Sequence, residues 1–183
     1  MIFGEVIGLR ALEYSDLEQL QIWRNNEQMR RYYREYRELS HCDQEAWYKA
    51  ICCGNRNFCM FGIAALHDCK EWSVASGQLL GVCGLTNINW VIRSAEISFY
   101  IGHRDLYVDD TFAPDALRTL CRYAFRALNI HKIWAEIYHF DTSKKTLFEK
   151  MSMHLDGTLR DSAFEDGAYH HALIYSLLET EFR

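Results

Sequence analysis

The fold is decided by residues 94–153, which read SAEISFYIGHRDLYVDDTFAPDALRTLCRYAFRALNIHKIWAEIYHFDTSKKTLFEKMSM. In residues 94–101 every second side chain is apolar, the period of a strand that buries one face. The opposite face carries Glu96, Ser98 and Tyr100. These three side chains are therefore predicted to lie together on one side of a sheet.

A helix and a second strand follow. From Pro114, which suits a first helical position, apolar residues recur every three or four positions as far as Leu128. Asn129 suits a left-handed cap, and residues 132–138 alternate again. A strand, helix, strand unit of this kind predicts a right-handed crossover and parallel strands. Ligand sites in such sheets tend to lie at the carboxyl end of the first strand.

Composition limits the class of protein. The 183 residues are enough for one domain with a substantial core. A net charge of −5 argues against non-specific nucleic acid binding. With no export signal and no apolar run of about eighteen residues, we expect a cytoplasmic protein and no membrane span. The seven cysteines lack paired C-x-x-C clusters, so we expect reduced thiols and no metal.

The rest of the chain supplies the remaining elements. Strands are predicted at 6–10, 58–66, 78–86, 155–164 and 168–178, and helices at 15–25, 43–51 and 143–151. Together with the central unit they form an α/β (α+β) fold. We expect one domain over residues 1–183, with a mixed, mostly antiparallel seven-stranded sheet and about four flanking helices.

Several short segments carry a resemblance to a known family. They are Ala95-Glu96 with Tyr100-Ile101-Gly102, Asn129-Ile130-His131-Lys132, Leu147-Phe148-Glu149-Lys150 and Asp156-Gly157-Thr158, in this order. The chain resembles the GNAT superfamily of acyl-CoA-dependent N-acyltransferases over nearly its whole length. Within it the chain is most similar to the branch of ribosomal-protein N-terminal and amino-sugar-nucleotide acetyltransferases. The resemblance implies that the strands ending near Gly102 and Tyr138 splay apart to admit acetyl-CoA.

The resemblance also implies which residues bind the cofactor. In the family a backbone N–H in the central strand stabilises the oxyanion, which points to Tyr100, Ile101 and Gly102. The diphosphate loop, usually Q/R-x-x-G-x-G/A, corresponds to Val108, Asp109, Asp110, Thr111, Phe112 and Ala113, where only Ala113 fits the pattern. Asp141, Lys144 and Phe148 complete the set. Asp141 replaces a usual asparagine, and Phe148 replaces a tyrosine that often protonates the thiolate.

The two acidic residues of this loop can be interpreted in two ways. Asp109 and Asp110 place negative charge beside a negative ligand, which predicts weakened acetyl-CoA binding. Alternatively, these carboxylates turn away from the ligand and cap the helix that begins near Pro114.

Acetyl transfer needs an unprotonated amine and an acid for the departing thiolate. Glu96 is the predicted base, because a carboxylate on the polar face of a central strand is buried beside the reaction. The alternative is a structural carboxylate paired with Arg24 or Arg93. Tyr100, Tyr138 and His170 are the candidate acids, and each is also a common structural residue.

The predicted acceptor site follows the first helix. The segment 24–37 has five arginines interleaved with tyrosines, and Trp23, Arg24, Asn25, Arg30 and Arg34 are the candidate substrate-binding residues. Such a cluster suits a phosphate-bearing acceptor. The alternative is a solvated helix pair in which Glu27, Glu35 and Glu38 neutralise the arginines.

The sequence therefore predicts an acetyl-CoA-dependent N-acetyltransferase acting on a primary amine. The acceptor is a small molecule, such as a nucleotide-linked amino sugar, or a protein N-terminus. A homodimer is compatible with this assignment, and no nucleic acid, membrane or metal partner is expected. Two alternatives remain open: a GNAT-fold binding or regulatory module that no longer uses coenzyme A, and an enzyme with a larger acyl donor.

Overall fold

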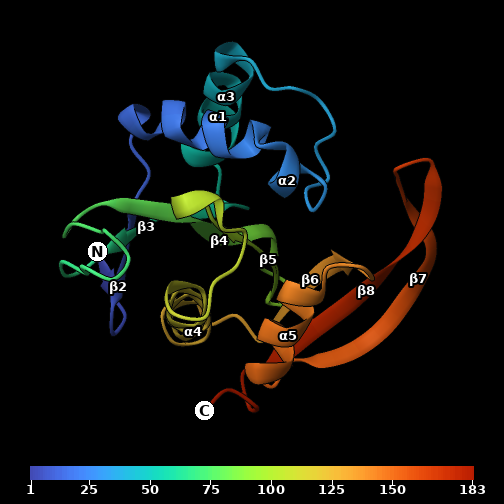
Figure 1. Cartoon of the computed structure of the whole chain (residues 1–183). Coiled ribbons are helices and arrows are strands. Elements are labelled where there is room, and N and C mark those ends of the chain that lie inside the picture. The colour runs from blue at the N-terminus through green and yellow to red at the C-terminus, as the bar shows by residue number, and fades with distance from the viewer.

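The computed structural model describes residues 1–183 as one mixed sheet with helices on both faces (Figure 1). The strand order is β1-β2-β3-β4-β5-β6-β8-β7. The strands are β1 (Ile2–Phe3), β2 (Ile7–Ala11), β3 (Cys59–Ala65), β4 (Leu79–Asn89), β5 (Ser94–Ile101), β6 (Lys132–Tyr138), β7 (His154–Glu165) and β8 (Ala168–Leu178). All seven predicted strands are present. The prediction missed β1, which is only two residues long and has no period to detect.

Five α-helices cover the two faces of the sheet. They are α1 (Leu17–Asn25), α2 (Glu27–Arg30), α3 (His41–Trp47), α4 (Phe112–Arg126) and α5 (Thr142–Lys150). Figure 1 shows α1, α2 and α3 on one side of the sheet and α4 and α5 on the other. The prediction of four helices missed the single turn α2, which starts where the Asn26 side chain accepts a hydrogen bond from Gln28 N–H. None of the helices is long and apolar enough to cross a lipid bilayer.

The crossover helix α4 begins two residues before Pro114, which is a correction to the predicted start. The reason is Asp109, whose carboxylate accepts hydrogen bonds from Phe112 N–H and Ala113 N–H. Pro114 still lies in the first turn, where an N–H would have no intrahelical partner. At the other end of α4, Asn129 has the predicted left-handed conformation with φ 57°.

The parallel strands β5 and β6 pair over only three residues. The pairs are Ser94–Lys132, Ala95–Ile133 and Glu96–Trp134, and every other neighbouring pair of strands is antiparallel. Beyond Glu96 and Trp134 the two strands separate. The expected splay is therefore present, and it starts at the predicted catalytic carboxylate.

Two hydrophobic clusters lie on opposite faces of the sheet. The larger contains the apolar face of β5, from Ala95 to Ile101, with the buried stripe of α4. The smaller contains Leu17, Leu20 and Trp23 of α1 packed with Tyr100. The alternation in β5 thus directs Glu96, Ser98 and Tyr100 toward the α1 side, as predicted.

Candidate active site

Glu96 lies at the centre of the site and is only 5% exposed. Its Oε1 accepts a hydrogen bond from Arg34 Nη2 at 2.7 Å, and its Oε2 accepts one from Asn87 Nδ2 at 2.7 Å. Thr86 Oγ1 lies 3.4 Å from the same Oε2. The arginine that neutralises Glu96 is therefore Arg34, whereas the sequence had suggested Arg24 or Arg93.

A pocket of about 490 Å³ lies between helices α1 and α3 and strands β3 to β5. We call it the α1–α3 pocket. Its walls are mainly apolar, from residues that include Leu20, Trp47, Ile51, Phe58, Met60, Val82 and Tyr100. At the sheet it is lined by Thr86 and Ser98, next to the Glu96 carboxylate. The pocket can therefore hold an apolar chain and present a polar end to Glu96.

Two polar atoms beside this pocket have no hydrogen-bond partner. They are Arg24 Nε and Tyr33 Oη, both buried. The Arg24 guanidinium lies 4.6 Å from the centre of the Tyr33 ring, which packs against Tyr100 at 5.3 Å. Burial raises the pKa of Tyr33, so its hydroxyl stays protonated. Unpaired buried donors are uncommon in folded proteins and are frequently satisfied by a ligand or water.

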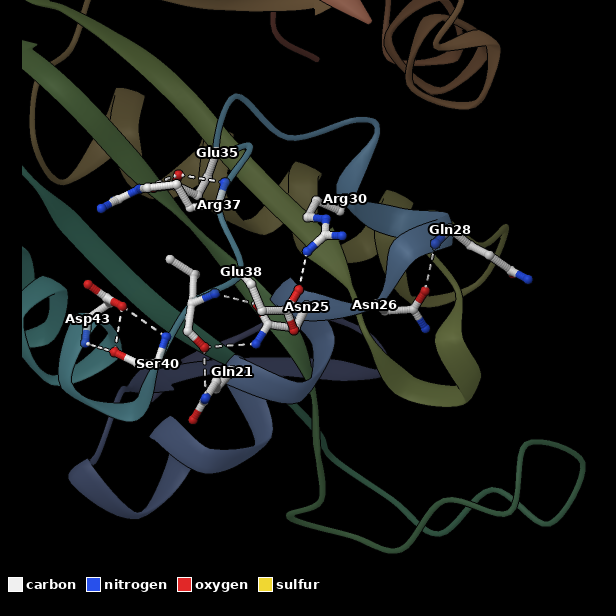
Figure 2. A network of polar contacts seen from close by, with 11 residues as sticks. Gln21, Asn25, Asn26, Gln28, Arg30, Glu35, Arg37, Glu38, Ser40 and Asp43 are labelled. Atoms are coloured by element: carbon white, nitrogen blue, oxygen red, sulfur yellow. Dashed lines mark hydrogen bonds and ion pairs between the residues drawn. The ribbon is translucent and has the colours of Figure 1, made fainter. Parts of the chain in front are cut away.

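The segment that carries Tyr33 and Arg34 runs from 31 to 40 between α2 and α3, and we call it the strap. Figure 2 shows how its C-terminal end is held. Asn25 exchanges two hydrogen bonds with the backbone of Leu39, and Arg30 pairs with Glu38. Ser40 caps α3 through Asp43. The C-terminal end of the strap is therefore fixed, and Arg34 in its middle reaches Glu96 of β5 and Glu136 of β6.

A second pocket, of about 550 Å³, lies on the other side of the strap between it, β6 and β7. We call it the strap pocket. It is polar, and Glu35 lines both it and the α1–α3 pocket. Its charged lining consists of Glu27, Glu35, Glu136 and Glu165 against Arg30, Arg31 and Arg34. The strap thus separates an apolar pocket from an acidic one.

Two of the predicted substrate-binding residues, Trp23 and Asn25, make contacts that hold the fold together. Trp23 is buried against Gly102, where a Cβ would lie 2.0 Å from Trp23 Cδ2. The Asn25 side chain makes two hydrogen bonds with the backbone of Leu39. Arg30 and Arg34 both pair with carboxylates, so neither guanidinium is free for a phosphate. Only Arg24 faces the α1–α3 pocket without an ion pair within the chain.

The backbone beside the splay offers one particular donor. Ile101 N–H donates to Tyr107 C=O at 3.0 Å and Gly102 N–H to Leu80 C=O at 2.8 Å. Tyr100, two residues before Gly102, faces Val82 of β4. The N–H groups of Tyr100, Ile101 and Gly102, which the family resemblance implied as oxyanion donors, therefore already face hydrogen-bond partners within the fold. Because N–H directions alternate along a strand, the N–H of Phe99 points to the same side as that of Ile101, into the splay.

The first two N–H groups of α4, those of Phe112 and Ala113, are not free to bind a diphosphate. Asp109 is 8% exposed, and its Oδ1 lies 2.7 Å from Ala113 N. Asp110 points outward and pairs with Lys150 Nζ at 3.0 Å. Asp109 therefore follows the capping alternative, and its carboxylate takes the place that a phosphate would need at this helix. The splayed strands suit the thioester arm of acetyl-CoA, whereas this loop, as arranged, does not suit its diphosphate.

Lys144 and Asp141 of the expected cofactor set lie together at the start of α5. Asp141 caps α5 through Lys144 N–H and accepts a hydrogen bond from Tyr107 Oη at 2.9 Å. The Lys144 ammonium lies 4.7 Å from the centre of the Tyr107 ring and 5.0 Å from that of Phe99. Burial lowers the pKa of Lys144 to about 8, although Asp141 acts in the opposite direction. A cation thus lies beside the splay.

The candidate acids differ in their surroundings. Tyr100 lines the α1–α3 pocket, and burial raises its pKa to about 12. Burial also raises the pKa of the half-buried Tyr138. His170 stacks on His139 at 5.2 Å, and its Nε2 lies 3.2 Å from Glu165 C=O. Phe148 is 1% exposed and belongs to the larger core. Of these groups, only Tyr100 lies at the α1–α3 pocket.

Three further residues of the site carry no distinctive pattern in the sequence. Asn87 lies one residue beyond the predicted strand 78–86 but inside β4, Tyr107 lies in an irregular loop, and Tyr33 is one of several tyrosines in its segment. Each reaches the site through tertiary packing, since their partners are Glu96, Asp141 and Tyr100. No group of three or more His, Cys, Asp or Glu side chains suited to a metal ion is present.

A splayed parallel pair with a buried carboxylate at its origin and a crossover helix defines the acyl-CoA-dependent acyltransferase fold. The chain matches the family described as Acetyltransferase (GNAT) domain over residues 7–154. It therefore belongs to the GNAT acetyltransferases, enzymes that use acetyl-CoA as co-substrate.

Individual relatives agree with this family. The chain is 29% identical over 105 residues to the uncharacterized N-acetyltransferase p20 of Bacillus licheniformis, covering 57% of this chain and 58% of p20, which is less than two thirds of that protein. It is 26% identical over 180 residues to spermidine N(1)-acetyltransferase of Vibrio cholerae, covering 96% and 95% of the two chains. The predicted ribosomal or amino-sugar branch is not confirmed.

A solved structure supports the fold. The spermidine N-acetyltransferase of Vibrio cholerae, in complex with CoA and spermine, superposes with a TM-score of 0.83 and 24% identity. The match covers 96% of each chain.

Proposed function

We propose that this protein transfers an acetyl group from acetyl-CoA to a primary amine carried on an apolar chain, with alkyl polyamines as the preferred class. The single observation that carries the proposal is the α1–α3 pocket, whose mainly apolar walls include Thr86, a neighbour of the buried Glu96 carboxylate. The activity of the spermidine N(1)-acetyltransferase relative supports the same class.

The roles assigned to the residues follow from the contacts of Glu96. The acceptor binds as an ammonium and gives one proton to Glu96, directly or through water. The new N–C bond then replaces the C–S bond of the thioester, with Phe99 N–H as the donor to the oxyanion. The second proton passes from the nitrogen to the Tyr100 oxygen as the Tyr100 hydroxyl protonates the departing thiolate, and Glu96 releases its proton to solvent. Tyr100, which stays protonated because burial raises its pKa to about 12, is the proposed acid.

The other predicted acceptors have less support. A nucleotide-linked amino sugar needs groups for its phosphates, and Arg30 and Arg34 already bind carboxylates. A protein N-terminus needs a site that binds the peptide following it. No contact described above supports such a site. Both stay predictions.

One observation favours a second function. Because the Asp109 carboxylate occupies the N–H groups of Phe112 and Ala113, the second candidate function is a binding module that has lost coenzyme A. Titration with acetyl-CoA by calorimetry tests this alternative, since a module of that kind does not bind the ligand at millimolar concentration.

The activity itself is tested by following thiol release from acetyl-CoA with spermidine, a peptide with a free N-terminus and a nucleotide-linked amino sugar. We expect kcat/KM to be largest for spermidine. Equal or better turnover of the phosphate-bearing acceptor would overturn the proposed acceptor class.

We also propose that the chain self-associates, as a homodimer or a larger assembly. The edge strand β7 is almost wholly exposed, and Leu155, Leu159 and Phe164 present apolar surface on it. A Vibrio cholerae spermidine N-acetyltransferase is dodecameric in one structure. Light scattering during size-exclusion chromatography tests the state, and a monomer at micromolar concentration would contradict it.

A further inference from the structure

Arg34 fills the space between two carboxylates on neighbouring strands. Its Nη2 lies 2.7 Å from Glu96 Oε1 and 3.6 Å from Glu136 Oε2. Glu96 is the last residue of β5 that pairs with β6, and Glu136 lies two residues beyond Trp134, its partner on β6. One nitrogen therefore touches both carboxylates at the point where the strands separate.

The partners of this contact differ in how they are fixed. The side chain of Glu96 is 7% exposed, whereas that of Arg34 is 52% exposed. Glu96 is also held by Asn87 from β4, while Arg34 belongs to the middle of the strap, outside any helix or strand. The guanidinium can therefore leave toward solvent, while the Glu96 carboxylate stays in place.

Whatever replaces Arg34 must be positively charged. Two carboxylates within reach of one nitrogen repel each other when no cation lies between them. The strap pocket strengthens this requirement for a positive charge, because without Arg34 it is lined by four carboxylates and two guanidinium groups. An ammonium is compact and carries three donors, so it can serve Glu96 and Glu136 at once.

We propose that the Glu96–Glu136 pair binds the ammonium of the acceptor, and that Arg34 is a built-in competitor which the acceptor must displace. This inference rests on the proposed function and deepens it. It assigns the acceptor a cationic amine, and it places that amine on Glu96, the carboxylate proposed to take its proton. Arg34 is then a specificity residue, since neutral or anionic ligands do not displace it.

The test is the affinity for spermidine in the absence of acetyl-CoA, measured by calorimetry. In Arg34→Met, which keeps the apolar stem, we expect spermidine to bind about tenfold more tightly than to the wild type. The double variant Arg34→Met/Glu136→Gln should lose this gain. Arg93→Met is the matched control, because Arg93 pairs with Glu179 away from the site, and it should leave the affinity unchanged.

A second measurement protects the test against a folding defect. Thermal unfolding establishes that Arg34→Met is folded, and Arg34→Gln replaces it otherwise. Millimolar methylguanidinium should refill the vacated position and weaken spermidine binding to the variant, but not to the wild type. Unchanged or weaker spermidine binding to folded Arg34→Met would overturn the proposal. Tightened binding without any turnover would instead overturn the proposed function and leave this inference intact.

Discussion

Asp109 Oδ1 lies 2.7 Å from the backbone nitrogen of Ala113, and Asp109 also accepts a hydrogen bond from Phe112 N–H. The chain thus places its own carboxylate at the helix N-terminus where the family resemblance leads us to expect the diphosphate. The helix dipole and the N–H groups stabilise this anion, as they would a phosphate. Acetyl-CoA binding must therefore either displace Asp109 or avoid this helix end.

We expect Asp109→Asn to bind acetyl-CoA more tightly than the wild type, by about tenfold, because it removes one negative charge near the ligand. The amide keeps only part of the cap, so stability should fall by about 1 kcal/mol. Calorimetry at two salt concentrations checks the affinity, and the gain should shrink at high salt. Asp110→Asn is the control: Asp110 is exposed, so neither quantity should change much. Unchanged affinity in Asp109→Asn would mean that the ligand never meets this carboxylate.

Glu96→Gln should lower kcat about a hundredfold, because the amide preserves the shape and cannot accept the proton. The comparison uses saturating acetyl-CoA and spermidine across a pH series. Thr86→Val serves as control, since Thr86 makes only a 3.4 Å contact with Glu96 and should cost less than tenfold. A Glu96→Gln enzyme with the wild-type rate at every pH would remove Glu96 from the mechanism.

Lys144 should make stability depend on pH in the alkaline range. Burial lowers its pKa to about 8 from the ordinary 10.5, so between these values the unfolded chain binds more protons than the folded one. Its contribution is therefore unfavourable below pH 8, and stability rises as pH increases from 8 to 10.5. Lys144→Met should stabilise the protein at pH 7, by at most about 3 kcal/mol.

Urea unfolding of both proteins at pH 7 and pH 10 isolates the effect of Lys144. The gain from Lys144→Met should be smaller at pH 10, where the lysine is already neutral in the folded state. Lys145→Met, at the exposed neighbouring position, should show no such difference. An equal gain at both pH values would indicate a packing effect and not a titration.

Gly102→Ala should destabilise the protein by more than about 2 kcal/mol, because the new Cβ would lie 2.0 Å from the buried Trp23 ring. The clash would also push α1 away from β5 and distort the α1–α3 pocket. Gly157→Ala is the control, since no heavy atom lies within 4 Å of its added Cβ. Thermal unfolding compares the two variants. Equal stability would mean that α1 can shift without loss.

The amino-acid pattern was sufficient to predict the central strand, helix, strand unit of the fold. Alternation in residues 94–101 and 132–138, separated by an α4 stripe of period 3.6, fixes two parallel strands and their buried faces, because each period admits only one apolar face. The same alternation put Glu96, Ser98 and Tyr100 on one side. These features are local, so no tertiary contact was needed to predict them.

Which charged side chains pair with each other could not be predicted from the sequence. The strap is distant in sequence from β5 and β6, yet it delivers Arg34 to Glu96 and Glu136, whereas the sequence had offered Arg24 or Arg93 as partners. The capping by Asp109 was one of two open alternatives until its carboxylate was located at Ala113 N–H. Ion pairs and helix caps depend on the positions that the charged ends of flexible side chains reach in the folded protein. The spacing of these residues along the chain has no period from which such positions could be predicted.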